Sequence, residues 1–191
     1  MYSREVGACA GPTLLVFAGP NGSGKSTATK GVQAPGVYVN ADELKRDYRL
    51  TDIEAAEQAE KLREKLLAGK YDFAFETVLS TRRNLDLMRR ASEAGYNVRC
   101  IYVLTCNADI NVARVKTRVA AGGHDVSEDK IRSRYSKALA LLPEVVDVCD
   151  EILVYDNSVT PELIFFKGRE GTRIEPNDCW TVSEIRKLIG E

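Results

Sequence analysis

The 191-residue chain lacks several features that would direct a search for its function. Its 27 lysines and arginines nearly balance 28 aspartates and glutamates, so a formal net charge of −1 provides no global field that attracts nucleic acid or an anionic membrane. No apolar run approaches the ~20 residues that span a bilayer. The short apolar start leads directly into a glycine-rich motif, which is not the pattern of a signal peptide. Partners are therefore to be inferred from local sites.

Cysteine and histidine are also scarce. The five cysteines are odd in number, scattered and without a CxxC spacing: Cys9, Cys100, Cys106, Cys149 and Cys179. This usage excludes a disulfide framework and a zinc cage, and it favours a reducing cytoplasm. The single histidine, His124, excludes a cluster of histidine metal ligands.

Short apolar runs alternate with helix-like segments along the chain. Strands are predicted at 13–19, 36–43, 71–80, 98–106 and 151–158, and helices at 51–67, 81–97, 107–121 and 127–142, before Pro143. A small hairpin at 163–174 and a closing helix at 181–189 complete the pattern. This alternation predicts a three-layer α/β/α sandwich with a mainly parallel five-stranded sheet. Without a repeat or linker, we expect one domain over 1–191, with a helical lid at about 107–141.

A phosphate-binding loop is the clearest motif. Residues 19–26, GPNGSGKS, match G-x-x-x-x-G-K-[ST] between the first strand and a helix start. Backbone N–H groups of such a loop surround the β-phosphate, Lys25 reaches the β and γ oxygens, and the Ser26 hydroxyl ligates Mg²⁺. We therefore expect ATP or GTP together with Mg²⁺. The expected nucleotide-binding residues are Gly19, Pro20, Asn21, Gly22, Ser23, Gly24, Lys25, Ser26 and Thr27.

Acidic residues end the next two predicted strands. Asp42 follows VYVNA and Glu76 follows FAF, and parallel strands bring their carboxyl ends to one edge of the sheet, where ligands collect. A kinase needs a carboxylate that accepts or orients the proton of the attacking hydroxyl. Asp42 fits this role with Asn40 beside it, and Glu76 with Thr77 is suited to contact substrate hydroxyls or help hold the metal. The alternative is that either carboxylate caps a helix.

A basic segment with a Gly-Gly hinge at 122–123 follows the fourth strand. It carries Arg114, Lys116, Arg118, Arg132 and Arg134 on two predicted helices. Arginines on a mobile segment neutralise the transferring phosphoryl group in many P-loop enzymes, so we interpret this segment as a lid. Arg132 and Arg134 are two residues apart and cannot both face the phosphates; some of these arginines are expected to be ordinary surface residues. His124 in the hinge either contacts a phosphate or substrate or makes a structural hydrogen bond.

Arg83, after the third strand, is a further candidate contact for an anionic substrate, with a solvated position at a helix start as the alternative.

The segments AGPNGSGKST, VNADE, FAFETVLS, RRASEAGYNVRCIYV, RVAAGGHDVSEDKIRSRY and ILVYDNS together resemble the zeta-toxin family of P-loop kinases, specifically its compact members, over about residues 13–158. The lid signature GGHDV followed by I-x-x-R-Y is the most specific part. The resemblance implies phosphorylation of the sugar of UDP-N-acetylglucosamine by ATP or GTP, and it makes a protein antitoxin a candidate partner.

The resemblance also implies roles for individual residues. Lys25 would bind the triphosphate, Asp42 would be the base, and Glu76 and Thr77 would contact the acceptor. Arg118 and one of Arg132 or Arg134 would stabilise the transferring group. Two alternatives stay open: a housekeeping metabolite kinase, and a nucleotide-dependent binding module or switch with little or no phosphoryl transfer.

Overall fold

A seven-stranded sheet runs through the computed structural model, which describes residues 11–123 and 125–191. The strands lie in the order β2-β3-β1-β4-β5-β6-β7; the first five in sequence pair in parallel, and the last two pair antiparallel. Their bounds are β1 Thr13–Ala18, β2 Val37–Val39, β3 Phe73–Thr77, β4 Asn97–Leu104, β5 Glu151–Asp156, β6 Glu162–Gly168 and β7 Gly171–Ile174. All five predicted strands are therefore confirmed.

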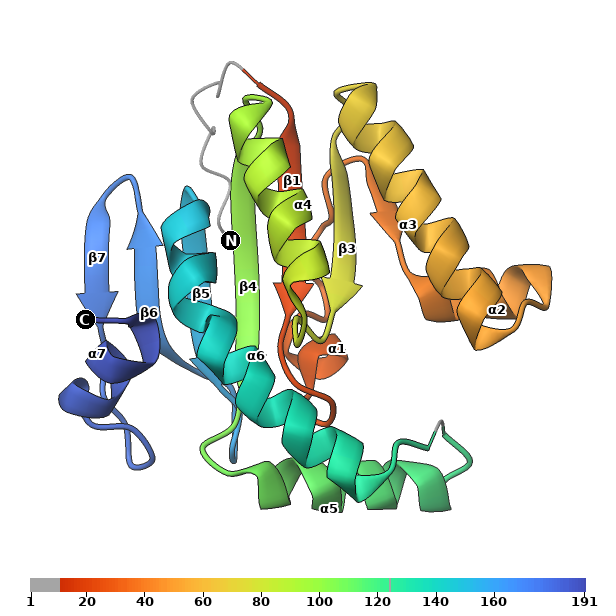
Figure 1. Ribbon diagram of the computed structural model, residues 1–191. Helices are drawn as coiled ribbons and strands as arrows, with labels where there is room; N and C mark the ends of the chain where they lie inside the picture. The colour runs from red at the N-terminus through yellow and green to blue at the C-terminus, as the bar shows by residue number, and fades with distance from the viewer. Residues whose placement is uncertain (1–10, 124) are drawn as a thin grey trace.

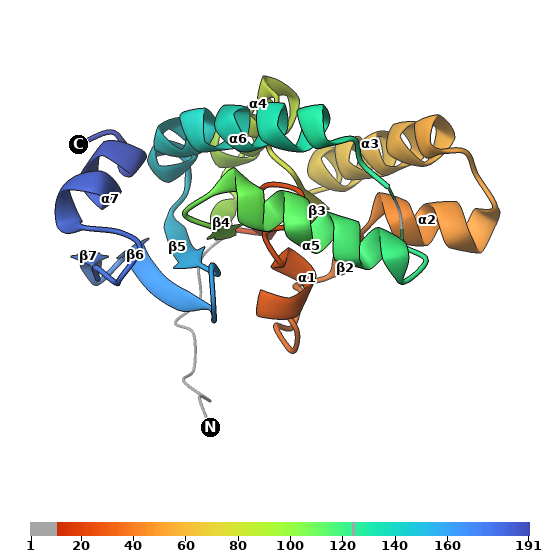
Figure 2. The same cartoon turned by 90° about the horizontal axis from the view of Figure 1, so that it is seen from below.

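Helices lie on both faces of the sheet and at one of its ends (Figures 1 and 2). The helices are α1 Lys25–Ala28, α2 Ala41–Tyr48, α3 Asp52–Ala68, α4 Arg82–Glu93, α5 Ala108–Ala120, α6 Glu128–Val148 and α7 Val182–Ile189. Figure 2 shows α3, α4 and α6 on one face and α1 on the other, while α5 crosses the end of the sheet. Within the described residues, no helix has both the length and the apolar composition that crossing a membrane requires.

Strand β1 shows why the sheet is central. Leu14 and Val16 are fully buried in the main core, which α3, α4, α6 and α7 complete, whereas Leu15 and Phe17 pack on the opposite face in a smaller cluster. A run that is apolar at every position is what a strand buried on both faces requires. The phosphate-binding loop therefore starts from a rigid central strand.

Two local details refine the prediction. The hairpin at 163–174 joins the same sheet as β6 and β7, which raises the strand number from five to seven. The prediction that a helix ends before Pro143 is wrong, because α6 continues to Val148 with Pro143 inside it. The neighbouring Leu142 and Val145 are fully buried, so core packing outweighs the backbone hydrogen bond that proline removes.

The segment predicted as a strand at 36–43 divides into β2, which ends at Val39, and the first turn of α2. Asn40 caps this helix through its side-chain oxygen, which accepts a 2.9 Å hydrogen bond from the Asp42 N–H. Asp42 consequently lies in the first turn and is not itself the cap. The next helix, α3, opens with a capping box formed by Thr51 and Glu54.

Candidate active site

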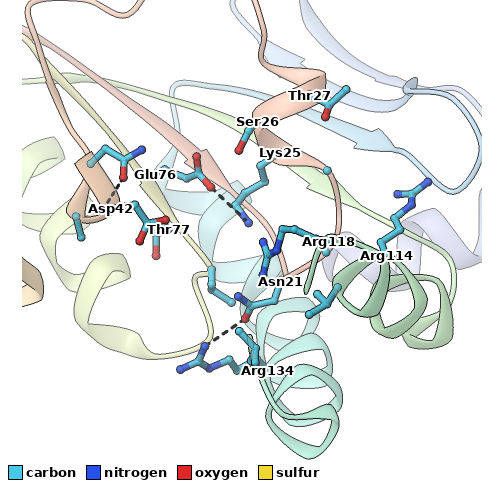
Figure 3. A pocket seen from close by; sticks show the side chains of 17 residues that line it. Asn21, Lys25, Ser26, Thr27, Asp42, Glu76, Thr77, Arg114, Arg118 and Arg134 are labelled. Atoms are coloured by element: carbon cyan, nitrogen blue, oxygen red, sulfur yellow. Dashed lines mark hydrogen bonds and ion pairs between the residues drawn. The ribbon is translucent and has the colours of Figure 1, made fainter. Parts of the chain in front are cut away.

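A cavity of about 570 Å³ opens at the carboxyl ends of the parallel strands. The loop after β1, the start of α2, the end of β3, and helices α5 and α6 all contribute to its walls. Figure 3 shows Lys25, Glu76, Arg118 and Arg134 around it. Segments far apart in the sequence therefore meet where an open α/β sheet collects its ligands.

Close packing fixes the shape of the loop at 19–26. Gly22 and Gly24 have φ angles of 78° and 85°, which favour glycine. A Cβ on Gly22 would lie 2.5 Å from the carbonyl oxygen of Asn111, and a Cβ on Gly24 would overlap the side-chain amide of Asn157. The glycines thus allow α5 and the end of β5 to approach the loop backbone.

Two buried asparagines brace the same loop. Asn111 on α5 donates a 2.6 Å hydrogen bond to the Asn21 carbonyl, and its own oxygen accepts one from the Thr105 hydroxyl. Asn157 donates a 2.7 Å bond to the Ser23 carbonyl. The two side chains are 0% and 7% exposed, so these bonds lie away from water. Neither role was predicted from the sequence, although Asn157 had a signal, because it is one of the polar residues that end the fifth predicted strand.

Lys25 occupies the centre of the loop. Its Nζ donates to the carbonyl oxygens of Gly19 and Pro20 at 2.8 and 3.2 Å, and it lies 3.8 Å from a Glu76 oxygen. Burial lowers the pKa of Lys25 and nearby Arg118 lowers it too, whereas the charges of Glu76 and Asp42 raise it. Phosphate oxygens in the cavity would add the negative charge that favours the ammonium form.

The cavity holds oxygen donors suited to a magnesium ion. Ser26 lines it at the start of α1, and the carboxylates of Asp42 and Glu76 line its other wall. Mg²⁺ prefers a few such oxygens together with substrate phosphates over an all-protein cage. Over 11–123 and 125–191, no group of three or more His, Cys, Asp or Glu side chains is placed to hold a metal ion.

Thr77 at the end of β3 is held in a defined orientation. Its carbonyl accepts a 3.2 Å bond from the Gly19 N–H, so β3 is joined to the phosphate loop. Its hydroxyl oxygen accepts bonds from the Leu79 N–H at 3.0 Å and from Asn84 at 2.7 Å. A hydroxyl has two acceptor lone pairs, so the proton of Thr77 is left to donate elsewhere.

The structure separates the lid arginines. Arg118 lines the cavity from α5, and Arg134 lines it from α6 with a 3.3 Å bond to the Asn21 side chain. Arg132 is outside the lining and forms ion pairs with Asp109 and Glu128 at 2.7 and 2.8 Å. Two residues along a helix correspond to about 200° of rotation, so the neighbouring side chains diverge.

Arg114 also lines the cavity. Its guanidinium donates to the carbonyl oxygens of Asn157 and Ser158 at 2.7 and 3.0 Å, which holds it beside Gly24. Two other expected contacts are placed differently. Arg83 pairs with Glu60 on α3 and is outside the cavity lining. His124 lies outside the described residues.

The final tyrosine of I-x-x-R-Y fixes α6 to the sheet. The Tyr135 hydroxyl donates a 2.6 Å hydrogen bond to the Thr105 carbonyl, just after β4. Burial raises the pKa of Tyr135 to about 12, with smaller contributions from Cys106 and Asp156. Adjacent residues of the signature thus have different tasks, since Arg134 faces the cavity and Tyr135 anchors the helix.

Similar proteins share both sequence and fold with this chain. The zeta toxin family profile matches residues 4–164. An uncharacterized protein of Haemophilus influenzae is 33% identical over 127 residues, which cover 63% of this chain and 91% of that protein.

Solved structures with the same fold include one from the PezAT chromosomal toxin-antitoxin system of Streptococcus pneumoniae. Its TM-score is 0.58 at 16% sequence identity, and the match covers 98% of this chain and 87% of that one. Another is AvrRxo1-ORF1:AvrRxo1-ORF2 with ATP, with a TM-score of 0.69, 14% identity and coverage of 94% of this chain. The chain spans only 64% of the length of that second structure's chain. With the profile match covering most of its length, the chain belongs to the zeta-toxin family and has the fold of a P-loop kinase.

Proposed function

We propose that this protein is a kinase that transfers the γ-phosphate of ATP or GTP to a hydroxyl group of a small molecule. One observation carries the proposal: the lysine of the phosphate-binding loop, two carboxylates and three arginines line a single cavity. These are the groups needed to bind the triphosphate, orient the attacking hydroxyl and stabilise the transferring phosphoryl group.

The triphosphate would occupy the side of the cavity formed by residues 19–27. Backbone N–H groups would surround the β-phosphate, and Lys25 would exchange its carbonyl partners for β and γ oxygens. The fixed, planar guanidinium of Arg114 offers a surface on which a nucleobase can stack. Ser26 would ligate Mg²⁺, and the ion would neutralise negative charge on the triphosphate.

The acceptor would approach from the side of α2 and β3. Its hydroxyl would donate its proton to Asp42 while the hydroxyl oxygen bonds to the γ-phosphorus and the bond to the departing diphosphate breaks. Glu76 would accept hydrogen bonds from acceptor hydroxyls, and the Thr77 hydroxyl would donate one. Asn40 would act by capping α2, which holds Asp42 in place.

Arg118 and Arg134 would stabilise the charge on the transferring oxygens. Arg132 and Arg83 are left out of the proposed set because each is held in an ion pair away from the cavity. Closure of the segment joining α5 to α6 would exclude water from the reaction.

Family membership supports two finer proposals. The proposed acceptor is a hydroxyl on the sugar of a UDP-N-acetyl sugar. The proposed location of the reaction is the cytoplasm, where ATP is abundant. A protein antitoxin is a partner, because one similar structure comes from a toxin-antitoxin system.

Replacement of Asp42 by asparagine separates a kinase from a nucleotide-dependent switch. The kinase proposal predicts that Asp42→Asn binds ATP normally and transfers no phosphoryl group to an acceptor that the wild type phosphorylates. Asp47→Asn is the matched control, since Asp47 lies on the same helix and pairs with Arg46 at its exposed side. Equal transfer by Asp42→Asn and wild type would remove Asp42 from the mechanism.

A further inference from the structure

Four side chains near the proposed acceptor site share one face of the sheet. In the parallel pairing of β2 with β3, Tyr38 lies opposite Ala74, and in the pairing of β1 with β3, Phe17 lies opposite Glu76. Paired residues and residues two apart along a strand point to the same face. Phe17, Tyr38, Asn40 and Glu76 are therefore neighbours, although neither the sequence motifs nor the cavity lining includes Tyr38.

Tyr38 is held at both ends. Its ring packs edge-on against Phe17, with centroids 6.1 Å apart and an interplanar angle of 76°. Its hydroxyl oxygen accepts a 3.4 Å hydrogen bond from the Asn40 amide, whose oxygen caps α2. Burial raises the pKa of the Tyr38 phenol, the negative charge of Glu76 raises it further, and the hydrogen bond from Asn40 lowers it. Because the bond from Asn40 uses the Tyr38 hydroxyl oxygen as an acceptor, the phenol proton is left to donate, and the Glu76 carboxylate is the neighbouring acceptor on this face of the sheet.

Lys25 is a second neighbour of Glu76 and competes with Tyr38 for its carboxylate. The Lys25 ammonium lies 3.8 Å away, beyond hydrogen-bond length, and is directed to the carbonyls of Gly19 and Pro20. The Lys25 side chain is buried and the Glu76 side chain is partly buried, so the unlike charges attract more strongly than they would in water. If the Glu76 carboxylate moved into direct contact with Lys25, it would occupy the ammonium group that binds phosphate oxygens. The carboxylate would then no longer be able to contact the acceptor substrate.

We propose that Tyr38 is a positioning residue that holds Glu76 beside Lys25 and prevents it from pairing closely with the ammonium group. The lysine then stays available to the triphosphate and the glutamate to the acceptor. This inference rests on the nucleotide binding of the proposed function, and its test uses ATP and requires no acceptor.

The test is a double-mutant cycle read by calorimetric titration with ATP and Mg²⁺. Tyr38→Phe keeps the ring on Phe17 and removes only the hydroxyl, so Glu76 can move onto Lys25 and ATP should bind about 3- to 10-fold more weakly. In a Glu76→Gln background there is no charge to compete for Lys25. There, adding Tyr38→Phe should leave ATP affinity unchanged. Tyr48→Phe, at the exposed end of α2, is the matched control and should bind ATP as the wild type does.

Two outcomes would overturn the inference: full ATP affinity in Tyr38→Phe, or an equal loss in both backgrounds, which is the mark of a general structural role. Titration of the Tyr38 phenol by ¹³C NMR gives a second readout that does not need the tyrosine variant to fold. Glu76→Gln should lower the pKa of Tyr38, and an unchanged pKa would refute the contact. If the cycle behaves as predicted while no acceptor is phosphorylated, the inference stands and the kinase proposal alone fails.

Discussion

Replacing Asn111 by alanine removes one of the two side chains that brace the phosphate-binding loop. The half-buried Asn21 carbonyl loses the 2.6 Å hydrogen bond that it accepts from the fully buried Asn111 side chain. Thr105 is affected less, because its hydroxyl also donates to the Asn107 carbonyl at 3.1 Å. An acceptor left without its partner costs about 1–3 kcal/mol when it is buried, and the lower part of that range applies to a half-buried carbonyl. For a chain of this size, each kcal/mol lowers the melting temperature by about 2–4 °C.

The same change should weaken ATP binding, because nucleotide binds the loop in its braced shape. If about 1–2 kcal/mol of this free energy is needed to restore the loop to the shape that binds nucleotide, the dissociation constant for ATP with Mg²⁺ should rise about 5- to 30-fold in calorimetric titration. Asn107→Ala is the matched control. The Asn107 side chain caps the start of the same helix, α5, by accepting a 2.8 Å hydrogen bond from the Asp109 N–H. Asn107→Ala should lose about 1 kcal/mol of stability and retain ATP affinity. Normal ATP affinity in Asn111→Ala, or an equal loss in the control, would refute the bracing role.

Three further predictions concern the same cavity. Gly24→Ala should abolish ATP binding, because φ is positive at this position and the added Cβ would overlap the buried amide of Asn157. Gly95→Ala is the control: φ is also positive there, but the space around it is open, so the change should cost only about 1 kcal/mol of stability in urea unfolding. Arg134→Ala should slow phosphoryl transfer about 100-fold, and Arg132→Ala should change it less than about twofold; comparable rates would contradict the placement of the two side chains. Burial lowers the pKa of Lys25, so the unfolded chain binds more protons than the folded one. The unfolding free energy of the wild type minus that of Lys25→Met should accordingly rise as the pH approaches 10.5, the ordinary pKa of lysine. A difference that falls with pH would exclude a lowered pKa.

The sequence was most informative where local chemistry decides the structure. The apolar run of β1, the glycines after it and the Thr51 capping box each specify a conformation with nearby residues alone. Strand alternation then places Asp42 and Glu76 at one edge, and both line the cavity. These features are fixed by backbone geometry and periodicity, which a single sequence displays directly.

Features that depend on distant contacts were not accessible in the same way. Asn111 and Asn157 brace the loop from positions 90 and 134 residues away from their partners. Nothing in the local pattern distinguishes Asn111 from a solvent-exposed asparagine, and Asn157 is marked only by its place at the end of a predicted strand. Helical spacing showed that Arg132 and Arg134 diverge, yet only the packing of α6 determines which of them faces the cavity. Pro143 was misread because core packing outweighed a local rule.

The central claim is phosphoryl transfer to a small-molecule hydroxyl. The most direct measurement is a mass-spectrometric search for molecules that gain one phosphoryl group when the protein, ATP and Mg²⁺ are incubated with a cell metabolite extract, with Lys25→Ala as the control. The account predicts a phosphorylated small molecule that appears with the wild type and is absent with Lys25→Ala. Nucleotide binding without any such product, across extracts that contain UDP-N-acetyl sugars, would contradict the kinase proposal and favour a nucleotide-dependent switch.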